Sequence, residues 1–270
     1  CAHTVELLTN PITFKLMIQV NNLHKSFGEE EILKGLNTKF EKGKTNLIIG
    51  QSGSGKTVFL KCLLGLFKPT KGNIVYDGQA YSEFSDEKQR ELRKKIGMVF
   101  QGSALFDSMT VRENVDFPLR MFTKEKRNVR YEKVDKVLER VNLDGAENKY
   151  PSEISGGMQK RVAIARAIVN NPKYLFCDEP NSGLDPKTAI VIDNLIQEIT
   201  REYDITTVIN THDMNSVLEI GENIVFLKKG NLVWQGNKDE IFKTENDDVT
   251  DFVYSSDLFK KVREAQLKGL

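Results

Sequence analysis

Apolar residues follow two different spacings along the chain, and together they predict alternating strands and helices. Short apolar runs at 47–49, 96–100 and 174–177 have the length of buried strands. Elsewhere apolar residues recur at i, i+3, i+4 and i+7, which predicts amphipathic helices. One contains Val134, Val137, Leu138 and Val141, and the other contains Ile192, Leu195, Ile196 and Ile199. This alternation is typical of an α/β fold.

Strand and turn signals extend the pattern toward both ends of the chain. Further strands are expected from Ile18, from Ile32, at 73–79 before an Asp-Gly turn, at 206–209 and at 224–236, the last as a hairpin. Ser85 is expected to cap a solvated helix within 82–95. A final helix is expected to contain Leu258, Phe259 and Val262.

Composition and charge exclude several classes of function. The 270 residues include 39 basic and 38 acidic side chains, so a net charge of +1 gives no bulk attraction to nucleic acid or to a membrane. There is no run of eighteen apolar residues and no signal peptide, so we expect neither a bilayer span nor export by that route. The three cysteines lack C-x-x-C spacing, which favours free thiols in a reducing cytosol.

The segment 50–57 carries the most specific motif of the chain. It fits G-x-x-x-x-G-K-[ST] between a predicted strand and a predicted helix, the context in which backbone N–H groups cradle phosphate. Lys56 is placed to reach the terminal phosphates, and the Thr57 hydroxyl is placed for Mg²⁺. The predicted triphosphate-binding residues are Gly50, Gln51, Ser52, Gly53, Ser54, Gly55, Lys56, Thr57 and Val58.

Polar residues stand at the ends of three later strands, where ligands collect in α/β sheets. Gln101 can contact Mg²⁺ or the attacking water, and Asp178 suits a Mg²⁺ contact through water. Glu179 can polarise water toward the γ-phosphate. His212 can donate a hydrogen bond to that phosphate, although a lone histidine is usually an ordinary loop residue.

Three other features leave alternatives open. Ser155, Gly156 and Gly157 cap an Ala-rich helix and form a second anion site, which a single phosphate loop does not explain. Phe27 either stacks on an adenine ring or packs in the core. Leu105 and Phe106 either form a docking surface for another protein or pack in the core.

The order of these motifs resembles the ABC-transporter ATPase family over about residues 17–245. The resemblance implies a P-loop NTPase (RecA-like) α/β core, an antiparallel β-subdomain and an inserted α-helical subdomain at about 102–170. It makes Phe27 the adenine-stacking aromatic, Gln101 the Q-loop, Asp178 and Glu179 the Walker B pair, and His212 the switch histidine. Residues 1–16 are then a tail and 246–270 a C-terminal helical extension.

The resemblance also implies ATP and Mg²⁺ as cofactors and a head-to-tail homodimer of cassettes. In such a dimer the signature of one copy, Ser155 to Met158, closes over the ATP of the other, and Asp185 belongs to the D-loop. Met158 and Asn181 depart from the residues common in the family without removing a charge. The implied activity is ATP hydrolysis, with Lys56, Gln101, Glu179 and His212 as the catalytic set.

Within the family, 101–111 and 113–119 resemble the Mla/Mce-type ATPases that drive lipid traffic between bacterial membranes. That subtype implies a phospholipid or other lipid as cargo, a membrane permease docking near Leu105 and Phe106, and an Mce-type substrate-binding protein. It places the chain on the cytoplasmic side of the inner membrane, held there by the permease and without inserting. The alternatives are an amino-acid or methionine importer ATPase and a regulatory ABC ATPase outside transport.

Overall fold

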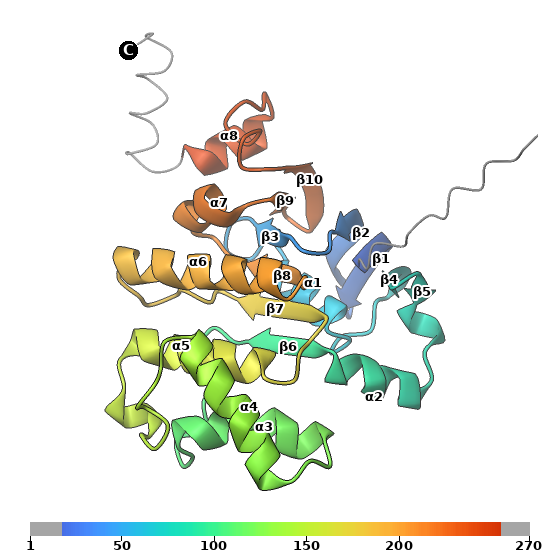
Figure 1. The fold of residues 1–270 in the computed structure, drawn as a ribbon. Coiled ribbons are helices and arrows are strands. Elements are labelled where there is room, and N and C mark those ends of the chain that lie inside the picture. Colours follow the sequence, from blue (N-terminus) through green and yellow to red (C-terminus); the bar gives the residue numbers. More distant parts are fainter. Residues whose placement is uncertain (1–17, 255–270) are drawn as a thin grey trace, which may run out of the picture.

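The computed structural model describes residues 18–254, which form two β-sheets and their covering helices (Figure 1). The smaller sheet is antiparallel, with the strand order β2-β1-β4-β5. The larger sheet has the order β10-β9-β3-β8-β7-β6 and is parallel except for the β10 edge. The strands are β1 Ile18–Phe27, β2 Glu30–Phe40, β3 Thr45–Ile49, β4 Lys71–Tyr76, β5 Gln79–Ala80, β6 Ile96–Val99, β7 Tyr174–Asp178, β8 Thr206–Asn210, β9 Asn223–Lys228 and β10 Asn231–Gly236.

Helices connect the strands and cover the larger sheet. Figure 1 shows α3, α4 and α5 gathered beyond the β6 edge, while α6 lies along the sheet. The α-helices are α1 Lys56–Leu63, α2 Asp86–Lys94, α3 Val111–Phe122, α4 Arg127–Arg140, α5 Gly156–Ile168, α6 Pro186–Glu202, α7 Met214–Ile220 and α8 Asp247–Val253. Two 3₁₀ turns, η1 Tyr81–Glu83 and η2 Pro151–Glu153, complete the connections.

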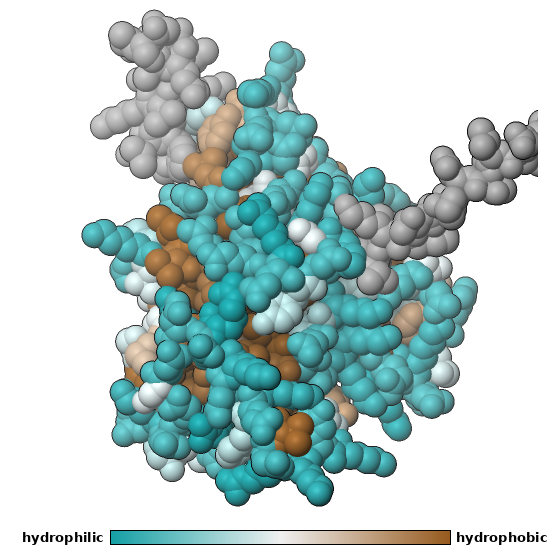
Figure 2. Space-filling model, in the orientation of Figure 1, coloured by the Kyte–Doolittle hydropathy of each residue, from teal (hydrophilic) through white to brown (hydrophobic). Residues whose placement is uncertain are grey.

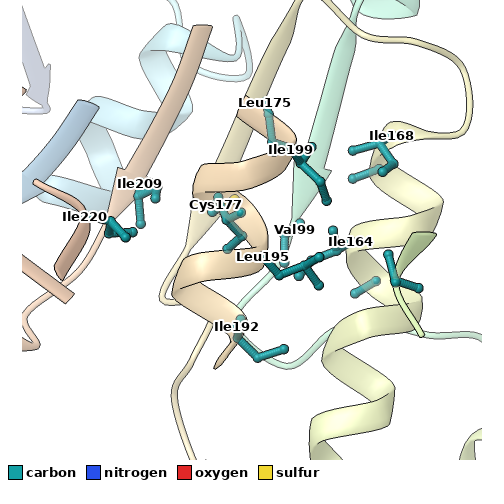
Figure 3. Close-up of a cluster of buried hydrophobic side chains, with 14 of the residues drawn as sticks. Val99, Ile164, Ile168, Leu175, Cys177, Ile192, Leu195, Ile199, Ile209 and Ile220 are labelled. Carbon is teal, nitrogen blue, oxygen red and sulfur yellow. The ribbon is translucent and has the colours of Figure 1, made fainter. Parts of the chain in front are cut away.

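Two hydrophobic clusters hold these layers together. One lies on the side of the larger sheet covered by α5, α6 and α7, and Figure 3 shows Leu175 and Cys177 of β7 beside Ile164 of α5 and Ile199 of α6. The other joins both sheets through α1, whose Phe59 and Leu63 are buried among strand residues. Strands buried on both faces read as continuous apolar runs, which is why the run at 174–177 is informative in the sequence.

The surface drawn in Figure 2 is mostly hydrophilic, with apolar residues gathered on the side where α6 and α7 lie. Within 18–254, no helix is long and apolar enough to cross a membrane.

The strands and helices predicted within 18–254 have the right type with small errors at their boundaries, but the helix α7 was not predicted. The Asp-Gly turn forms as expected, with positive φ at Asp77 and Gly78, and Ser85 caps α2 by accepting a hydrogen bond from the Lys88 N–H. The segment 96–100 is one residue too long as a strand prediction, because Phe100 leaves the sheet and is 44% exposed. The helix α3 has no counterpart among the predictions, and the predicted helix around Leu258 lies outside the described residues.

The topology determines where polar side chains meet. In the parallel part of the sheet, β3 lies between β8 and β9, and β7 lies between β6 and β8. The carboxyl ends of β3, β6, β7 and β8 therefore share one edge of the sheet. The segments that follow them at this edge begin at Gly50, Phe100, Glu179 and Thr211.

Candidate active site

The loop between β3 and α1 is folded tightly enough to require glycine. At Gly50, where φ is 149°, a Cβ atom would lie 2.3 Å from the Leu227 carbonyl oxygen. Gly55 is the N-cap of α1, with φ of 102°, and supplies no side-chain cap. The first N–H groups of an α-helix have no partner within the helix, so this end of α1 presents donors and positive potential to an anion.

The Lys56 side chain lies inside the loop and binds its backbone. Its ammonium donates to the carbonyl oxygens of Gly50 at 2.8 Å and Gln51 at 3.1 Å, and the residue is 7% exposed. Burial lowers the pKa of Lys56, and the nearby carboxylates of Glu179 and Asp178 oppose that shift. A buried cation facing two carboxylates beside unpaired helix N–H groups is well suited to bind phosphate.

Glu179 is the centre of a hydrogen-bonded chain at the same edge. The Gln101 side-chain amide donates to Glu179 Oε2 at 2.9 Å, and His212 Nδ1 lies 2.9 Å from Glu179 Oε1. The Glu179 backbone N–H donates to the Asn210 carbonyl oxygen, although φ of 47° places the residue in the left-handed region. Three side chains that were assigned from strand ends are thus in contact.

Asp178, Asn210 and Thr57 form a second polar group below Glu179. The Asn210 amide donates to Asp178 Oδ1 and, at 3.4 Å, to Thr57 Oγ1, while the buried Asn210 Oδ1 has no hydrogen-bond partner. Burial raises the pKa of Asp178, and the Asn210 hydrogen bond opposes the rise. A hydroxyl, a carboxylate and an unsatisfied amide oxygen are the hard donors that suit Mg²⁺, so the residues present fit that cation.

A cavity of about 780 Å³ is lined by Gln101, Glu179 and His212 of the first group and by Thr57 of the second, but not by Asp178 or Asn210. Most of the predicted phosphate and catalytic residues line it, as do two residues that no motif indicated, Ile32 of β2 and Phe252 of α8. The lining is Ile32, Gln51, Ser52, Gly53, Gly55, Lys56, Thr57, Val58, Gln101, Glu179, His212 and Phe252.

Phe27 lies at the end of β1 and does not belong to this lining. Its ring is 45% exposed and makes an edge contact with Phe67, with the centroids 5.2 Å apart. Lys25 places its ammonium 4.7 Å from the Phe27 centroid. The core alternative for Phe27 is therefore wrong, and an exposed ring remains available for stacking.

The signature segment does not reach the cavity of its own chain. Ser155 is exposed and caps α5 by accepting a hydrogen bond from the Met158 N–H, and Gly156 is also exposed. Asp185 caps α6 in the same way through the N–H groups of Lys187 and Thr188. Ser155, Gly156 and Asp185 thus lie at the exposed N-termini of two helices, and none of them is part of the lining around Lys56.

Leu105 and Phe106 differ in burial. Leu105 packs against the core, whereas Phe106 is 40% exposed and makes a tilted ring contact with Phe117, with the centroids 4.8 Å apart. Phe106 also lines a second, mostly apolar cavity of about 380 Å³, to which Met98, Phe117 and Phe122 contribute.

Comparison with known proteins agrees with this geometry. The family model described as "ABC transporter" matches residues 33–182, which include the phosphate loop, Gln101, the Ser155 cap and Glu179. The chain belongs to the ABC transporter family. Its fold is that of an ABC ATPase cassette, so the predicted fold class is confirmed.

Two relatives and two solved structures show how far the similarity extends. The cassette is 39% identical over 236 residues to the "probable ribonucleotide transport ATP-binding protein mkl" of Mycobacterium tuberculosis H37Rv, covering 87% of this chain and 66% of that protein. It is 38% identical over 257 residues to the "methionine import ATP-binding protein MetN" of Campylobacter jejuni, covering 89% of this chain and 76% of that protein.

Among solved structures, the dimeric bacterial ABC transporter cassette MJ0796 is 34% identical with a TM-score of 0.74, over 82% of this chain and 98% of that one. The cbiO1 protein of Clostridium perfringens, part of a cbiONQ transporter complex, is 30% identical with a TM-score of 0.80. That match covers 95% of this chain and 100% of that one.

Asn210 is a further site residue, besides Ile32 and Phe252, that the motifs did not indicate. It is the last residue of β8, it is 1% exposed, and it bridges Asp178 and Thr57. The signal in the sequence was its position: it lies two residues before His212, at the end of a strand that reaches the same sheet edge as the phosphate loop.

Proposed function

We propose that this cassette is the ATP-binding and ATP-hydrolysing subunit of an ABC transporter. The observation that carries the proposal is the contact of Glu179 with both Gln101 and His212 at the rim of a cavity floored by the phosphate loop. A carboxylate held beside the terminal-phosphate position can orient and polarise an attacking water.

Each side chain then has a definite task. The loop 50–57 and the N-terminus of α1 bind the phosphates, and Lys56 neutralises their charge. Glu179 acts on the water, while Gln101 and His212 orient the Glu179 carboxylate and contact the γ-phosphate. Asp178, Thr57 and Gln101 are the residues that would hold Mg²⁺, which neutralises charge on the β- and γ-phosphates when bound.

The decisive substitution is Glu179→Gln. It keeps the size and shape of the side chain but replaces the carboxylate base with a neutral amide, so ATP turnover should fall at least about a hundredfold while ATP binding persists. Steady-state phosphate release, with nucleotide binding measured by calorimetry, gives both quantities. Glu132→Gln, on the exposed side of α4, is the matched control. Wild-type turnover in Glu179→Gln would remove Glu179 from the catalytic role.

The exposed Ser155 cap supports a two-copy site. Its helix N-terminus is exposed and is not part of the lining of the chain's own cavity, so an anion site there is explained if it binds the ATP of a second copy. The related cassette MJ0796 has been solved as a dimer. In the homodimer that we propose, Ser155, Gly156, Gly157 and Met158 complete the partner's site, and Asp185 lies at the junction.

The apolar cavity with Phe106 supports a permease contact. Phe106, Phe117 and Phe122 leave aromatic surface exposed beside the loop that follows Gln101, so a permease segment seated there could act on the catalytic amide. The permease would also hold the cassette at the cytoplasmic face of the inner membrane.

For the cargo we propose a lipid, with an Mce-type substrate-binding protein as a further partner. The support is the resemblance of 101–119 to Mla/Mce-type ATPases. The second candidate is a small-solute importer, favoured by the names of the mycobacterial and Campylobacter relatives, which refer to ribonucleotides and methionine. Purification of the membrane complex with lipid analysis separates them: bound phospholipid with an Mce-type protein supports the first, and a small-solute binding protein supports the second.

A further inference from the structure

Lys160 is buried in the signature helix although no phosphate role requires it there. It stands in the second turn of α5 and is 5% exposed. Lysine is almost never buried without a partner, and a cation near a helix N-terminus is opposed by the helix dipole. A lysine buried at such a position needs a specific interaction that offsets the cost of burying its charge.

The partner is the backbone of the catalytic glutamine. The Lys160 ammonium donates to the Gln101 carbonyl oxygen at 2.5 Å, and the Ser182 hydroxyl lies 3.5 Å from the same oxygen. Burial lowers the pKa of Lys160, and the Glu179 carboxylate opposes that shift through its charge. Lys160 therefore lies in the electrostatic field of the catalytic carboxylate.

These contacts connect the signature cap to the catalytic residues of the same chain. Ser155, at the start of α5, is the anion cap that faces outward, and Lys160 is five positions further along the same rigid helix. From Lys160 the chain of contacts runs through Gln101 to Glu179 and then to His212. A shift of α5 is thus transmitted to the Gln101 backbone, and from there to the amide that touches Glu179.

We propose that Lys160 is a positioning residue that couples the signature cap of one copy to the catalytic carboxylate in its own nucleotide site. The inference rests on the proposed function, in which the cap engages the ATP of a second copy. When the cap closes on that ATP, α5 carries Lys160 and with it the Gln101 backbone, and so adjusts the amide that already contacts Glu179. Engagement at one site thereby activates the other, and ATP hydrolysis is cooperative.

The test compares Lys160→Met, which keeps length and loses the donor, with Lys160→Arg, which keeps charge and donors. For Lys160→Met we expect kcat to fall about tenfold and the Hill coefficient for ATP to fall toward 1, with MgATP affinity within about twofold of wild type. Lys160→Arg should recover most of the cooperativity. Lys136→Met, an exposed lysine on α4, is the matched control and should behave like wild type.

A purely structural lysine would give a different pattern. It would lower the thermal midpoint and the active fraction but leave the Hill coefficient of the remaining enzyme unchanged, and that result overturns the proposal. If Lys160→Met does not fold, Lys160→Leu, which also lacks a donor, carries the same comparison. Wild-type protein that binds MgATP without hydrolysing it would instead refute the proposed function, which separates the two failures.

Discussion

Glu179 occupies a backbone conformation that is unfavourable for any residue with a Cβ atom. Its φ of 47° lies in the left-handed region, and the Asn210 carbonyl oxygen holds its N–H group there. Such conformations cost of the order of 1–3 kcal/mol and persist where the surroundings impose them. Here the conformation directs the carboxylate toward both Gln101 and His212, so local strain is linked to the position of the catalytic group.

Lys56 gives the first prediction at the scale of single residues. Lys56→Ala removes the ammonium that binds Gly50 and Gln51 and that would bind the terminal phosphates, so ATP affinity should fall at least about a hundredfold. Isothermal calorimetry with MgATP measures the change, and Lys136→Ala is the exposed control. Unchanged affinity in Lys56→Ala would contradict the phosphate-binding role of the loop.

Asp193 gives the second prediction at this scale. Its carboxyl is buried and contacts Asn181, in the segment that follows Glu179. Asn181 donates to Asp193 Oδ2 at 3.2 Å and to the Ser216 hydroxyl at 2.8 Å, while Asp193 Oδ1 has no hydrogen-bond partner. Burial raises the pKa of Asp193 to about 7, and the Ser216 hydrogen bond opposes the rise. The folded protein therefore binds a proton that the unfolded chain releases.

Because the folded-state pKa is the higher one, this carboxyl makes unfolding progressively easier as pH rises toward about 7. Between pH 5 and pH 7.5 we expect its contribution to the free energy of unfolding to fall by about 2 kcal/mol. Asp193→Asn should remove that part of the pH dependence, as measured by urea unfolding at several pH values. Parallel pH profiles for Asp193→Asn and wild type would show that Asp193 is already ionised in the fold.

At the scale of elements, α3 shows both what sequence patterns reveal and what they conceal. The helix buries Val111, Val115 and Leu119 on one face, but Phe117 and Pro118 interrupt the apolar spacing and obscure it. A capping box at Thr110 and Glu113 marks its start and was the signal that could have predicted it.

The strand ends, by contrast, were predictable. Gln101, Asp178, Glu179 and His212 each follow a predicted strand, and parallel strands bring their carboxyl ends to one edge. Contacts between distant segments were not predictable, because they depend on tertiary packing. Lys160 and Gln101, which are in contact, lie 59 positions apart in the sequence, and Asn210 and Thr57 lie 153 positions apart.

Asn114 connects α3 to the loop that carries Phe106. Its amide donates to the carbonyl oxygens of Phe106, Met109 and Thr110, and its Oδ1 accepts from the Phe106 N–H. This buried side chain fixes the loop, so Phe106 presents its exposed ring from a rigid support rather than from a flexible segment.

Phe106 gives a prediction about the loop that precedes α3. Phe106→Ala should leave the basal ATPase rate of the isolated cassette within about twofold of wild type but reduce its stimulation by the permease at least about tenfold, because the aromatic contact is lost. Val129→Ala, also exposed but outside the groove, is the matched control. Normal stimulation of Phe106→Ala in the reconstituted complex would assign the ring to packing against Phe117 alone.

At the scale of the whole molecule, the two anion sites of one chain are separate from each other. The cavity over Lys56 and Glu179 contains the catalytic chain, and the Ser155 cap stands outside its lining. A head-to-tail pair of copies brings each cap over the other's cavity, which gives two equivalent sites related by a twofold axis. In that arrangement, ATP hydrolysis by this cassette requires residues from both copies.

Mixing two inactive variants tests that claim most directly. Glu179→Gln disables the catalytic side of a site, and Gly156→Asp places a negative charge at the signature cap, where an acidic residue still suits the helix N-terminus and space exists for a Cβ atom. Each variant alone should be inactive. In an equal mixture, each mixed dimer contains one site with both sides intact, so phosphate release should rise well above that of either variant alone. The upper limit is about a quarter of the wild-type rate, because half of the dimers are mixed and each has one such site, and loss of the coupling through Lys160 lowers it further. A mixture as inactive as its components would contradict the shared site.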